Sequence, residues 1–290
     1  MSAKHPVIAV TGSSGAGTST VRSVFERIFR REEVRAAMIE GDSFHRYERD
    51  ALQRLNAERV ARGEAVLSLF GPHANHFADL ETLFRTYAES GAGRRRRYLH
   101  DTREAEPFGQ PPGTFTPWED LPRETDLLFY EGLHGAVRTE TVDVARYPDL
   151  LIGVAPVVNL EWIQKIHRDT TLRGYSRETV TQIILNRIPD YVHYIVPQFG
   201  LTHINFQRVP IVDTSNPFIA REIPIPGESM VVIRFADPRG VDFPYLLAMI
   251  QGAFMSRANT IVIPGDRQDL AMQLIFTPLV WRLMARRHGD

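Results

Sequence analysis

The chain has 290 residues, of which 43% are hydrophobic and 24% are charged, and its formal net charge at pH 7 is −1. This composition is typical of a globular protein with enough apolar side chains for one large domain or two small ones, and the near-zero charge gives no general attraction to nucleic acid or to an acidic membrane surface. Because the chain has no cysteine, disulfides, thiol switches, cysteine nucleophiles and cysteine-based zinc sites are excluded.

The first elements along the chain are a short apolar strand at residues 7–10, a glycine-rich turn and a helix over 19–31. The turn, residues 12–19, follows the P-loop pattern G-x-x-x-x-G-K-[ST], except that Thr18 stands in place of the lysine. In such a turn, backbone N–H groups surround an anion at the positive end of the helix, and the hydroxyl of Ser19 would bind the Mg2+ that accompanies ATP. An ordinary glycine turn is the less favoured alternative. We therefore predict that the ATP phosphates contact Gly12, Ser13, Ser14, Gly15, Ala16, Gly17, Thr18, Ser19 and Thr20.

A second strand is predicted at 35–40, and Asp42 follows it, before a charged helix over 48–62. A carboxylate at the carboxyl end of a strand, near the γ-phosphate, can act as general base for an attacking hydroxyl. The alternative is that Asp42 only caps the next helix. His45 and Arg49 lie three and seven residues further on, so a single helix would turn them toward the same side as Asp42. This arrangement favours an acceptor that carries its own phosphate.

An amphipathic helix over 77–89 is followed by a polar, proline-rich stretch at 91–123. Inside a kinase, such a stretch indicates a mobile flap over the phosphates rather than a domain linker. Its run of four arginines, 94–97, is interpreted first as a solvated face, with phosphate contact as the alternative. A buried strand at 126–130 then ends at Glu131, which resembles a Walker B acid and would hold Mg2+ directly or through water. An exposed strand-end carboxylate is the alternative.

Another buried strand at 150–154 precedes helices at 162–169 and 179–187, the second with Ser176 as its N-cap. The chain has only two lysines, Lys4 and Lys165. Lys165 is therefore the candidate to supply the ammonium that the P-loop lacks, although an ion pair with the glutamate one turn earlier would explain it equally well.

Arg168 and Asp169, with Arg173 beside a glycine, form a second charged cluster in this region. Arginines around a glycine turn after a helix commonly close over transferring phosphates. Further strands are predicted at 209–212 and 230–235, flanking the central sheet, and a terminal helix over 269–287 should be kinked or broken at Pro278.

No internal repeat and no long linker interrupts the chain, so we predict one domain over residues 1–290. The fold class is α/β, with a mostly parallel central sheet, flanking helices and added antiparallel strands. Because a strand and a P-loop begin within the first dozen residues, no cleavable signal is expected. The charge-free run 191–207 is too polar and too interrupted to span a bilayer. We therefore expect a cytoplasmic enzyme without a membrane or nucleic-acid partner.

Taken together, the segments 12–20, 40–46, 129–135 and 161–169 closely resemble phosphoribulokinases of the proteobacterial type, including the threonine in the P-loop. Similar segments continue at 212–221 and 255–259, so the resemblance covers nearly the whole chain. It implies a P-loop kinase fold like that of adenylate kinase. It also implies transfer of the ATP γ-phosphoryl group to O1 of D-ribulose 5-phosphate, which gives ribulose 1,5-bisphosphate, the carbon dioxide acceptor of the Calvin cycle.

Carried over by position, the resemblance implies a role for each candidate residue: Asp42 is the general base, His45, Arg49 and Arg173 contact the sugar phosphate, Lys165, Arg168 and Asp169 are active-site groups, and Glu131 is a metal ligand. Asp169 stays open between a second metal-linked carboxylate and a partner for arginine. The family often carries two arginines at 186 and 187, whereas this chain has Asn186 before Arg187, which leaves the contribution of the first arginine in doubt.

The resemblance also implies assembly and regulation. Similar bacterial enzymes are homo-oligomers, typically octamers, activated by NADH and inhibited by AMP, whereas the plant and cyanobacterial type is switched by a disulfide that this chain cannot form. An effector site for such anions needs arginines away from the catalytic centre, with pairing to structural carboxylates as the alternative. The candidates are Arg31, Arg221, Arg234 and Arg257.

Two other functions stay open at this point. One is a related P-loop kinase for an uncharged acceptor such as uridine or pantothenate, which would not need the cations near Asp42. The other is a nucleotide-gated switch that binds ATP without turning it over, which would need a positioned water instead of a base for a substrate hydroxyl.

Overall fold

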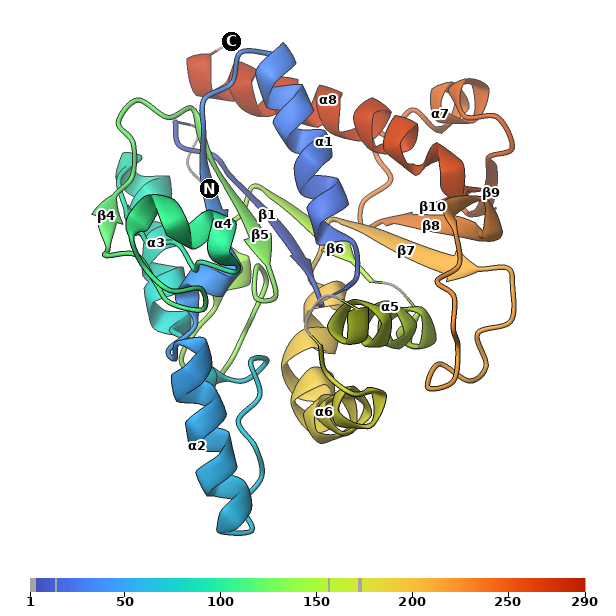
Figure 1. Cartoon of the computed structure of the whole chain (residues 1–290). Helices are drawn as coiled ribbons and strands as arrows, with labels where there is room; N and C mark the ends of the chain where they lie inside the picture. The colour runs from blue at the N-terminus through green and yellow to red at the C-terminus, as the bar shows by residue number, and fades with distance from the viewer. Residues whose placement is uncertain (1–3, 14, 156, 172–173, 290) are drawn as a thin grey trace.

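The computed structural model describes residues 4–13, 15–155, 157–171 and 174–289. The chain is built around an eight-stranded sheet with the order β2-β5-β1-β6-β7-β8-β10-β9 (Figure 1). Its first five strands are parallel: β2 (Ala36–Glu40), β5 (Leu127–Gly132), β1 (Val7–Gly12), β6 (Leu150–Val154) and β7 (Ile204–Pro210). The last three, each antiparallel to its neighbour, are β8 (Ser229–Phe235), β10 (Thr260–Pro264) and β9 (Phe254–Arg257). The predicted α/β class, with a mostly parallel sheet and added antiparallel strands, is confirmed.

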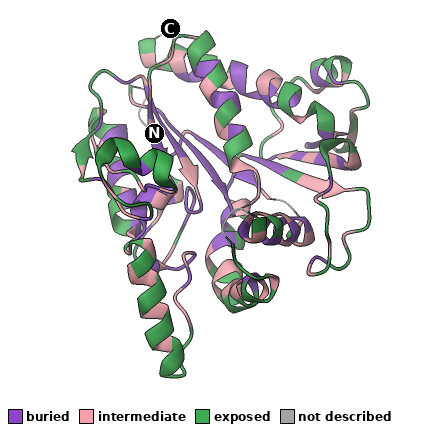
Figure 2. Ribbon diagram, in the orientation of Figure 1, coloured by how far each residue is buried: buried purple, intermediate pink, exposed green. Residues whose placement is uncertain are grey.

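Helices cover both faces of the sheet, and each face has its own hydrophobic core. In β1, side chains alternate between the two cores, so Ile8 and Val10 face one and Val7 and Ala9 face the other. The first core lies under the helices α1 (Thr18–Arg31) and α8 (Gln268–His288), and the second under α3 (Phe77–Ser90). In Figure 2 the strands are mostly buried and the outer sides of these helices are exposed.

Three more helices lie beyond the carboxyl ends of the parallel strands (Figure 1). The pair α5 (Val158–Thr171) and α6 (Arg177–Asp190) packs together, and the side chain of Ser176 accepts a hydrogen bond from the N–H of Thr179, as predicted for an N-cap. The helix α2 (Arg49–Ala61) projects from the molecule at the foot of Figure 1. After Pro189, which interrupts the hydrogen bonding of α6, the chain continues as a π-helix, η5 (Tyr191–Ile195).

The structure differs from the predicted elements in the last third of the chain. The strand predicted at 209–212 is β7, which begins earlier because Ile204 and Phe206 are buried, and Ile211 beyond it is 65% exposed. The strands β9 and β10 and the helix α7 (Phe243–Met249) were not predicted. The terminal helix is not broken, since α8 runs through Pro278 and keeps residues on both sides of it buried.

The predicted flap at 91–123 has more regular structure than a loose segment. The strands β3 (Arg94–Arg95) and β4 (Glu119–Asp120) pair at its base, and it contains the short helix α4 (Thr102–Ala105). An isolated bridge joins Tyr98 to Phe115. Within the described residues, no helix combines the length and the apolar character needed to cross a membrane.

The strands β2 and β5 come unusually close at their carboxyl ends. A Cβ atom on Gly132 would lie 2.7 Å from the Cα of Gly41 and 2.8 Å from the hydroxyl oxygen of Tyr130. Because the obstacle includes backbone, we expect Gly132→Ala to lower the free energy of unfolding by about 1–3 kcal/mol, measured by chemical denaturation. The matched control is Gly200→Ala, whose Cβ would meet none of the described atoms within 4 Å. Equal unfolding midpoints for the two variants would contradict this close packing.

Candidate active site

The glycine-rich turn between β1 and α1 has the conformation expected of a phosphate-binding loop. Gly15 and Gly17 have φ angles of +98° and +97°, which favour glycine. The N-cap of α1 is Gly17, which has no side chain to accept from the N–H groups of the first turn and so leaves them to an anion in the loop. Within the predicted ATP-binding run 12–20, Gly12 ends β1, residues 15–17 form the turn and Thr18, Ser19 and Thr20 open α1, whereas Ser14 lies outside the described residues.

Glu131, at the end of β5, lies beside this loop. Burial raises the pKa of its carboxyl group, and a hydrogen bond with the side chain of Thr18 opposes that shift. Thr18, in the place of the usual lysine, begins α1 and contacts the acid, and Ser19 after it is exposed. Among the described residues no group of three or more His, Asp or Glu side chains could hold a metal ion. A metal held by Glu131 and Ser19 therefore needs phosphate oxygens as further ligands, as is usual for Mg2+.

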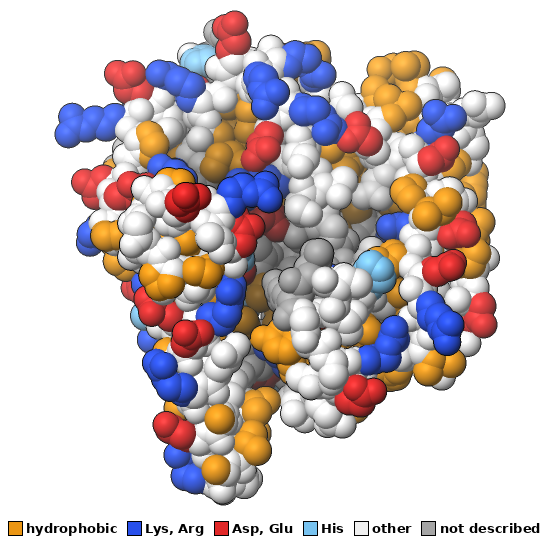
Figure 3. Space-filling view, in the orientation of Figure 1, with side chains coloured by type: hydrophobic (Ala, Val, Ile, Leu, Met, Phe, Trp, Pro, Cys, Tyr) orange, Lys and Arg blue, Asp and Glu red, His pale blue; other side chains and the backbone are white. Residues whose placement is uncertain are grey.

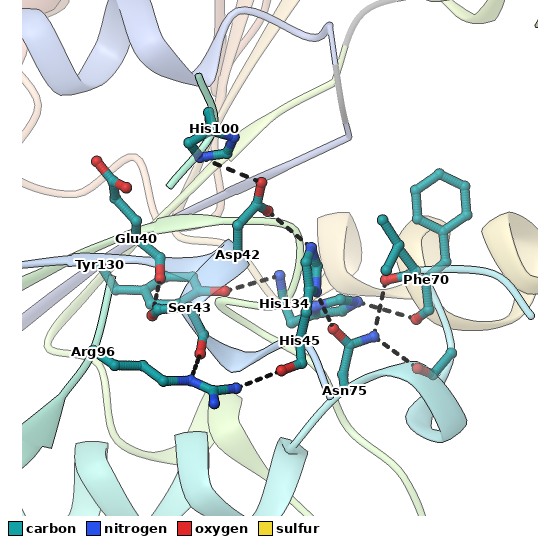
Figure 4. A network of polar contacts seen from close by, with 12 residues as sticks. Glu40, Asp42, Ser43, His45, Phe70, Asn75, Arg96, His100, Tyr130 and His134 are labelled. Atoms are coloured by element: carbon teal, nitrogen blue, oxygen red, sulfur yellow. Dashed lines mark hydrogen bonds and ion pairs between the residues drawn. The ribbon is translucent and has the colours of Figure 1, made fainter. Parts of the chain in front are cut away.

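Asp42 lies in a short 3-10 helix, η1 (Gly41–Phe44), which follows β2 directly. Its Oδ1 is 3.2 Å from Nε2 of His45 and its Oδ2 is 3.8 Å from Nε2 of His100, which comes from the flap (Figure 4). Burial raises the pKa of Asp42, but the charges of the two histidines outweigh it and hold that pKa well below its usual range. The side chain of Asp42 is 37% exposed. The site therefore holds an ionised carboxylate that a ligand can reach.

A contact with Asn75, on the side of the ring away from Asp42, fixes the orientation of His45. Its Nδ1 lies 2.8 Å from Oδ1 of Asn75, whose Nδ2 donates to the carbonyl oxygens of Leu69 at 2.9 Å and Gly71 at 2.7 Å. With its amide nitrogen committed to two carbonyls, Asn75 presents its oxygen to His45, so Nδ1 of His45 carries the hydrogen. Nε2 then faces Asp42, which raises the pKa of His45 although burial lowers it. The ring of His45 thus lies between Asn75 and the carboxylate of Asp42 (Figure 4).

The prediction of a single helix through Asp42, His45 and Arg49 is wrong. The 3-10 helix ends at Phe44, His45 is extended, and α2 begins only at Arg49. Asp42 does not cap α2 either, because the residue at that position is Glu48. His45 still reaches Asp42, whereas Arg49 turns to the flap and donates to the carbonyl oxygen of His100 at 2.8 Å.

Arg96 differs from the other members of the arginine run. Its guanidinium donates to the carbonyl oxygens of Ser43 at 2.8 Å and His45 at 2.5 Å (Figure 4) and lies 3.7 Å from the ring centroid of Phe115. Burial lowers its pKa. Arg96 thus fastens the segment that carries Asp42 to the flap, a role that neither interpretation of the run anticipated.

The helix α5 carries three of the candidate residues. Nζ of Lys165 lies 2.6 Å from Oδ2 of Asp169, and Nε of Arg168 lies 2.9 Å from Oδ1 of the same carboxylate. The ion pair of Lys165 is therefore with Asp169 and not with Glu161, contrary to the alternative that the sequence suggested. Burial lowers the pKa of Lys165 to about 8, although Asp169 opposes that shift. Arg173 lies outside the described residues.

The helix α5 also lies directly against the P-loop. A Cβ atom on Gly15 would be 3.7 Å from the carbonyl oxygen of Glu161 and 3.8 Å from the backbone nitrogen of Lys165. The molecular surface is hollowed between the flap and the α5–α6 pair, and acidic and basic side chains meet in this hollow (Figure 3). Three groups lie at the same edge of the sheet, because they follow the adjacent strands β1, β5 and β2: the P-loop, Glu131 and Asp42 respectively.

Three site residues could not be identified from sequence: His100, Asn75 and Arg96. Each belongs to a segment that meets Asp42 only through tertiary contacts. No motif surrounds His100 or Asn75, and nothing in the run of four arginines distinguishes Arg96.

The proposed effector arginines are not brought together as one cluster. Arg31 pairs with Glu32 at 2.7 Å and donates to Thr277 at 2.8 Å, so the structural alternative describes it well. Arg234 donates to the carbonyl oxygen of Phe199 at 3.2 Å. Arg257 is on β9, the strand at the edge of the same sheet. The strand β10 lies between β8 and β9, and its Thr260 pairs with Arg234 on one side and with Arg257 on the other. Arg221 is exposed in the connection before β8.

The comparisons with known proteins agree on one family. A family model described as Phosphoribulokinase / Uridine kinase family matches residues 7–215. The plasmid phosphoribulokinase of Cupriavidus necator is 66% identical over 287 residues, which cover 99% of this chain and 98% of the relative. The phosphoribulokinase of Sinorhizobium medicae is 61% identical over 99% of both chains. The solved structure of phosphoribulokinase from Rhodobacter spheroides superposes with a TM-score of 0.91, at 57% identity, over 99% of this chain and 100% of that one.

Proposed function

The chain belongs to the phosphoribulokinase/uridine kinase family, and on this premise we propose that it phosphorylates D-ribulose 5-phosphate at O1 with ATP, forming ribulose 1,5-bisphosphate for the Calvin cycle. The observation that carries the proposal is the ionised Asp42 between two histidines, on the same sheet edge as the P-loop. A phosphorylated acceptor accounts for the cationic groups around that carboxylate, whereas uridine would not need them.

Asp42 is the general base in this proposal. It accepts the proton of the O1 hydroxyl while O1 forms a bond to the γ-phosphorus and the bond from that phosphorus to the bridging oxygen of ADP breaks. His45 keeps Asp42 ionised and orients it, and Asn75 in turn orients His45. Arg49, already tied to the flap, and Arg173 are proposed to bind the phosphate of the sugar. The predicted phosphate contact of His45 is left out, because its two ring nitrogens face Asp42 and Asn75 and the residue is only 4% exposed.

The P-loop and the helix α5 stabilise the charge that develops on the transferred phosphoryl group. The N–H groups of the turn 12–20 bind the ATP phosphates, and the ammonium of Lys165, with Arg168, faces the transferred group. Asp169 holds both cations in place, which favours its role as their partner over that of a metal ligand. Glu131 and Ser19 would hold Mg2+, which would offset the negative charge of the ATP phosphates.

The direct test measures ADP release from MgATP with ribulose 5-phosphate, with uridine, or without an acceptor. Turnover only with the sugar phosphate supports the proposal. Turnover with uridine would favour a nucleoside kinase on the same scaffold. ATP binding without turnover on any acceptor would favour the nucleotide-gated switch.

We further propose, from the resemblance alone, that the enzyme is a cytoplasmic homo-octamer activated by NADH and inhibited by AMP. The same assay with each effector tests the regulation, and sedimentation velocity tests the assembly.

Substituting Arg234 or Arg257 by glutamine should abolish the response to NADH and leave basal turnover unchanged, because Arg234 lies on β8 and Arg257 on β9, and neither is among the residues around Asp42.

The pH dependence offers a separate test of the Asp42–His45 pair. The variant His45→Asn removes a charge that lowers the pKa of Asp42. Because burial raises this pKa, we expect the pKa of Asp42 to be higher in the variant. The acidic limb of kcat/KM should therefore move to higher pH, because the base becomes protonated earlier as pH falls. His73→Asn is the matched control, since His73 is exposed. An unmoved acidic limb in His45→Asn would show that His45 does not set the ionisation of the base.

A further inference from the structure

The mechanism gives no role to the buried carboxyl group of Glu161. The side chain of Glu161, on the first turn of α5, is almost fully buried, since the residue is 4% exposed. The hydroxyl of Tyr191 donates to its Oε2 at 2.9 Å. Burial raises the pKa of Glu161, and the nearby hydroxyls of Ser13 and Tyr191 oppose that shift. Ser13 belongs to the P-loop, so this carboxyl group lies where three separate segments meet.

The helix α5 lies close to the P-loop. Glu161 and Lys165 supply the two backbone atoms of α5 that lie nearest the site where a Cβ on Gly15 would be. Oγ of Ser13 and Oε1 of Gln164 are buried there without a hydrogen-bond partner of full geometry among the described residues. Beside these unpartnered atoms, the bond between Glu161 and Tyr191 is a polar contact with full geometry.

Tyr191 is anchored to the sheet by its own element. It is the first residue of η5, and a π-helix is a rare element that is frequent at functional sites. Gln198, which is 2% exposed, donates to the carbonyl oxygens of Tyr194 at 2.7 Å and Leu133 at 2.9 Å, and accepts from the hydroxyl of Thr11 at 2.9 Å. The π-helix is thus fixed to β1 and to the segment after β5. The bond from Tyr191 extends this anchorage to α5.

We propose that Glu161 and Tyr191 are positioning residues that hold α5 against the P-loop and so fix Lys165 relative to the ATP phosphates. Lys165 lies one helical turn after Glu161 on the same side of α5. A lateral shift of α5 would move the ammonium away from the transferred group without removing any group that contacts a substrate. Misplacement on the scale of 1 Å is enough to cost about 10²-fold in rate.

The test variants each alter the hydrogen bond between Tyr191 and Glu161. Tyr191→Phe removes one hydroxyl and keeps the ring, so kcat should fall by about tenfold, with the KM for ribulose 5-phosphate unchanged. Glu161→Gln keeps an oxygen that can accept from Tyr191 and should retain most of the rate, whereas Glu161→Leu should match Tyr191→Phe. The control is Tyr194→Phe, in the same π-helix, whose ring packs on Phe77. In the double variant Tyr191→Phe with Glu161→Leu, the losses should not add, because both remove the same bond.

Unchanged kcat in Tyr191→Phe, or losses that add fully in the double variant, would overturn the inference. The inference rests on the proposed transfer to ribulose 5-phosphate. Wild-type turnover in the same assay therefore distinguishes failure of the positioning role from failure of the proposed function. Amide hydrogen exchange in α5 tests the anchorage without catalysis. Faster exchange over residues 160–166 in Tyr191→Phe than in Tyr194→Phe is expected, and equal exchange would overturn the inference even if the wild type had no activity.

Discussion

Replacing Asp42 with asparagine is expected to lower kcat by about 10²- to 10⁴-fold, the usual contribution of a general base. Asparagine has nearly the same shape but cannot accept the O1 proton as a carboxylate does. The η1 backbone should be retained, because Arg96 holds the carbonyl oxygens of Ser43 and His45 independently of the carboxylate. ATP affinity, measured by isothermal calorimetry, should therefore stay close to that of the wild type, since the P-loop is not altered.

The chain offers a matched control for this variant. Asp79 and His76 form another Asp–His pair three residues apart, with 3.2 Å between Nδ1 and Oδ2, but the Asp79 side chain is 59% exposed and belongs to α3. Asp79→Asn should leave kcat unchanged. Turnover of Asp42→Asn within a few-fold of the wild type would reject the general-base assignment, whereas loss of ATP binding would indicate a structural role for Asp42.

Local sequence patterns sufficed to locate the candidate site. A glycine-rich turn and two strand-end acids can each be identified from a few adjacent residues. Because parallel strands present their carboxyl ends at one edge, the sequence already placed the turn 12–20, Asp42 and Glu131 together. The structure has β2, β5 and β1 as neighbours, in agreement with that expectation. The chemical roles of these residues stay predictions until variants are measured.

The same local reasoning failed where backbone groups bond outside their own segment. A helix through residues 42–49 needs the carbonyl oxygens of Ser43, Phe44 and His45 for its own N–H groups. In the structure Arg96 binds the first and the third, and the N–H of His76 donates to the second at 2.8 Å. The flap and the segment before α3 therefore compete successfully for these carbonyls. No local pattern in 42–49 contains that information.

The ion pair of Lys165 shows a related limit. Glu161 and Asp169 lie four residues before and four residues after this lysine, so spacing along a helix allowed either as its partner. The structure separates them, because Glu161 bonds to Tyr191, whereas the ion pair of the ammonium within the described residues is with Asp169. Tertiary contacts of α5 thus decide which acid is free to pair with the lysine.

Replacing Lys165 with methionine should lower kcat by about 10²- to 10³-fold, the usual cost of removing one group that stabilises transition-state charge, and should raise the KM for ATP much less. Methionine fills a similar volume, so the packing of α5 is largely kept. Asp169, whose side chain is 3% exposed, loses one cation but keeps Arg168 at 2.9 Å, which limits the loss of stability. The other lysine supplies the control, because Lys4 is exposed and Lys4→Met should leave both constants unchanged.

The pH dependence distinguishes a catalytic ammonium from a structural one. The pKa of Lys165 is lowered to about 8, chiefly by burial, so the side chain is charged below that pH and neutral above it. If the charge acts in the transition state, kcat of the wild type falls as pH rises through about 8, and the residual activity of Lys165→Met lacks this limb. If Lys165 only stabilises α5, the variant lowers the unfolding temperature and keeps both the rate and the alkaline limb. The ion pair of Lys165 with Asp169 would then be structural, and Lys165 would not replace the missing P-loop lysine.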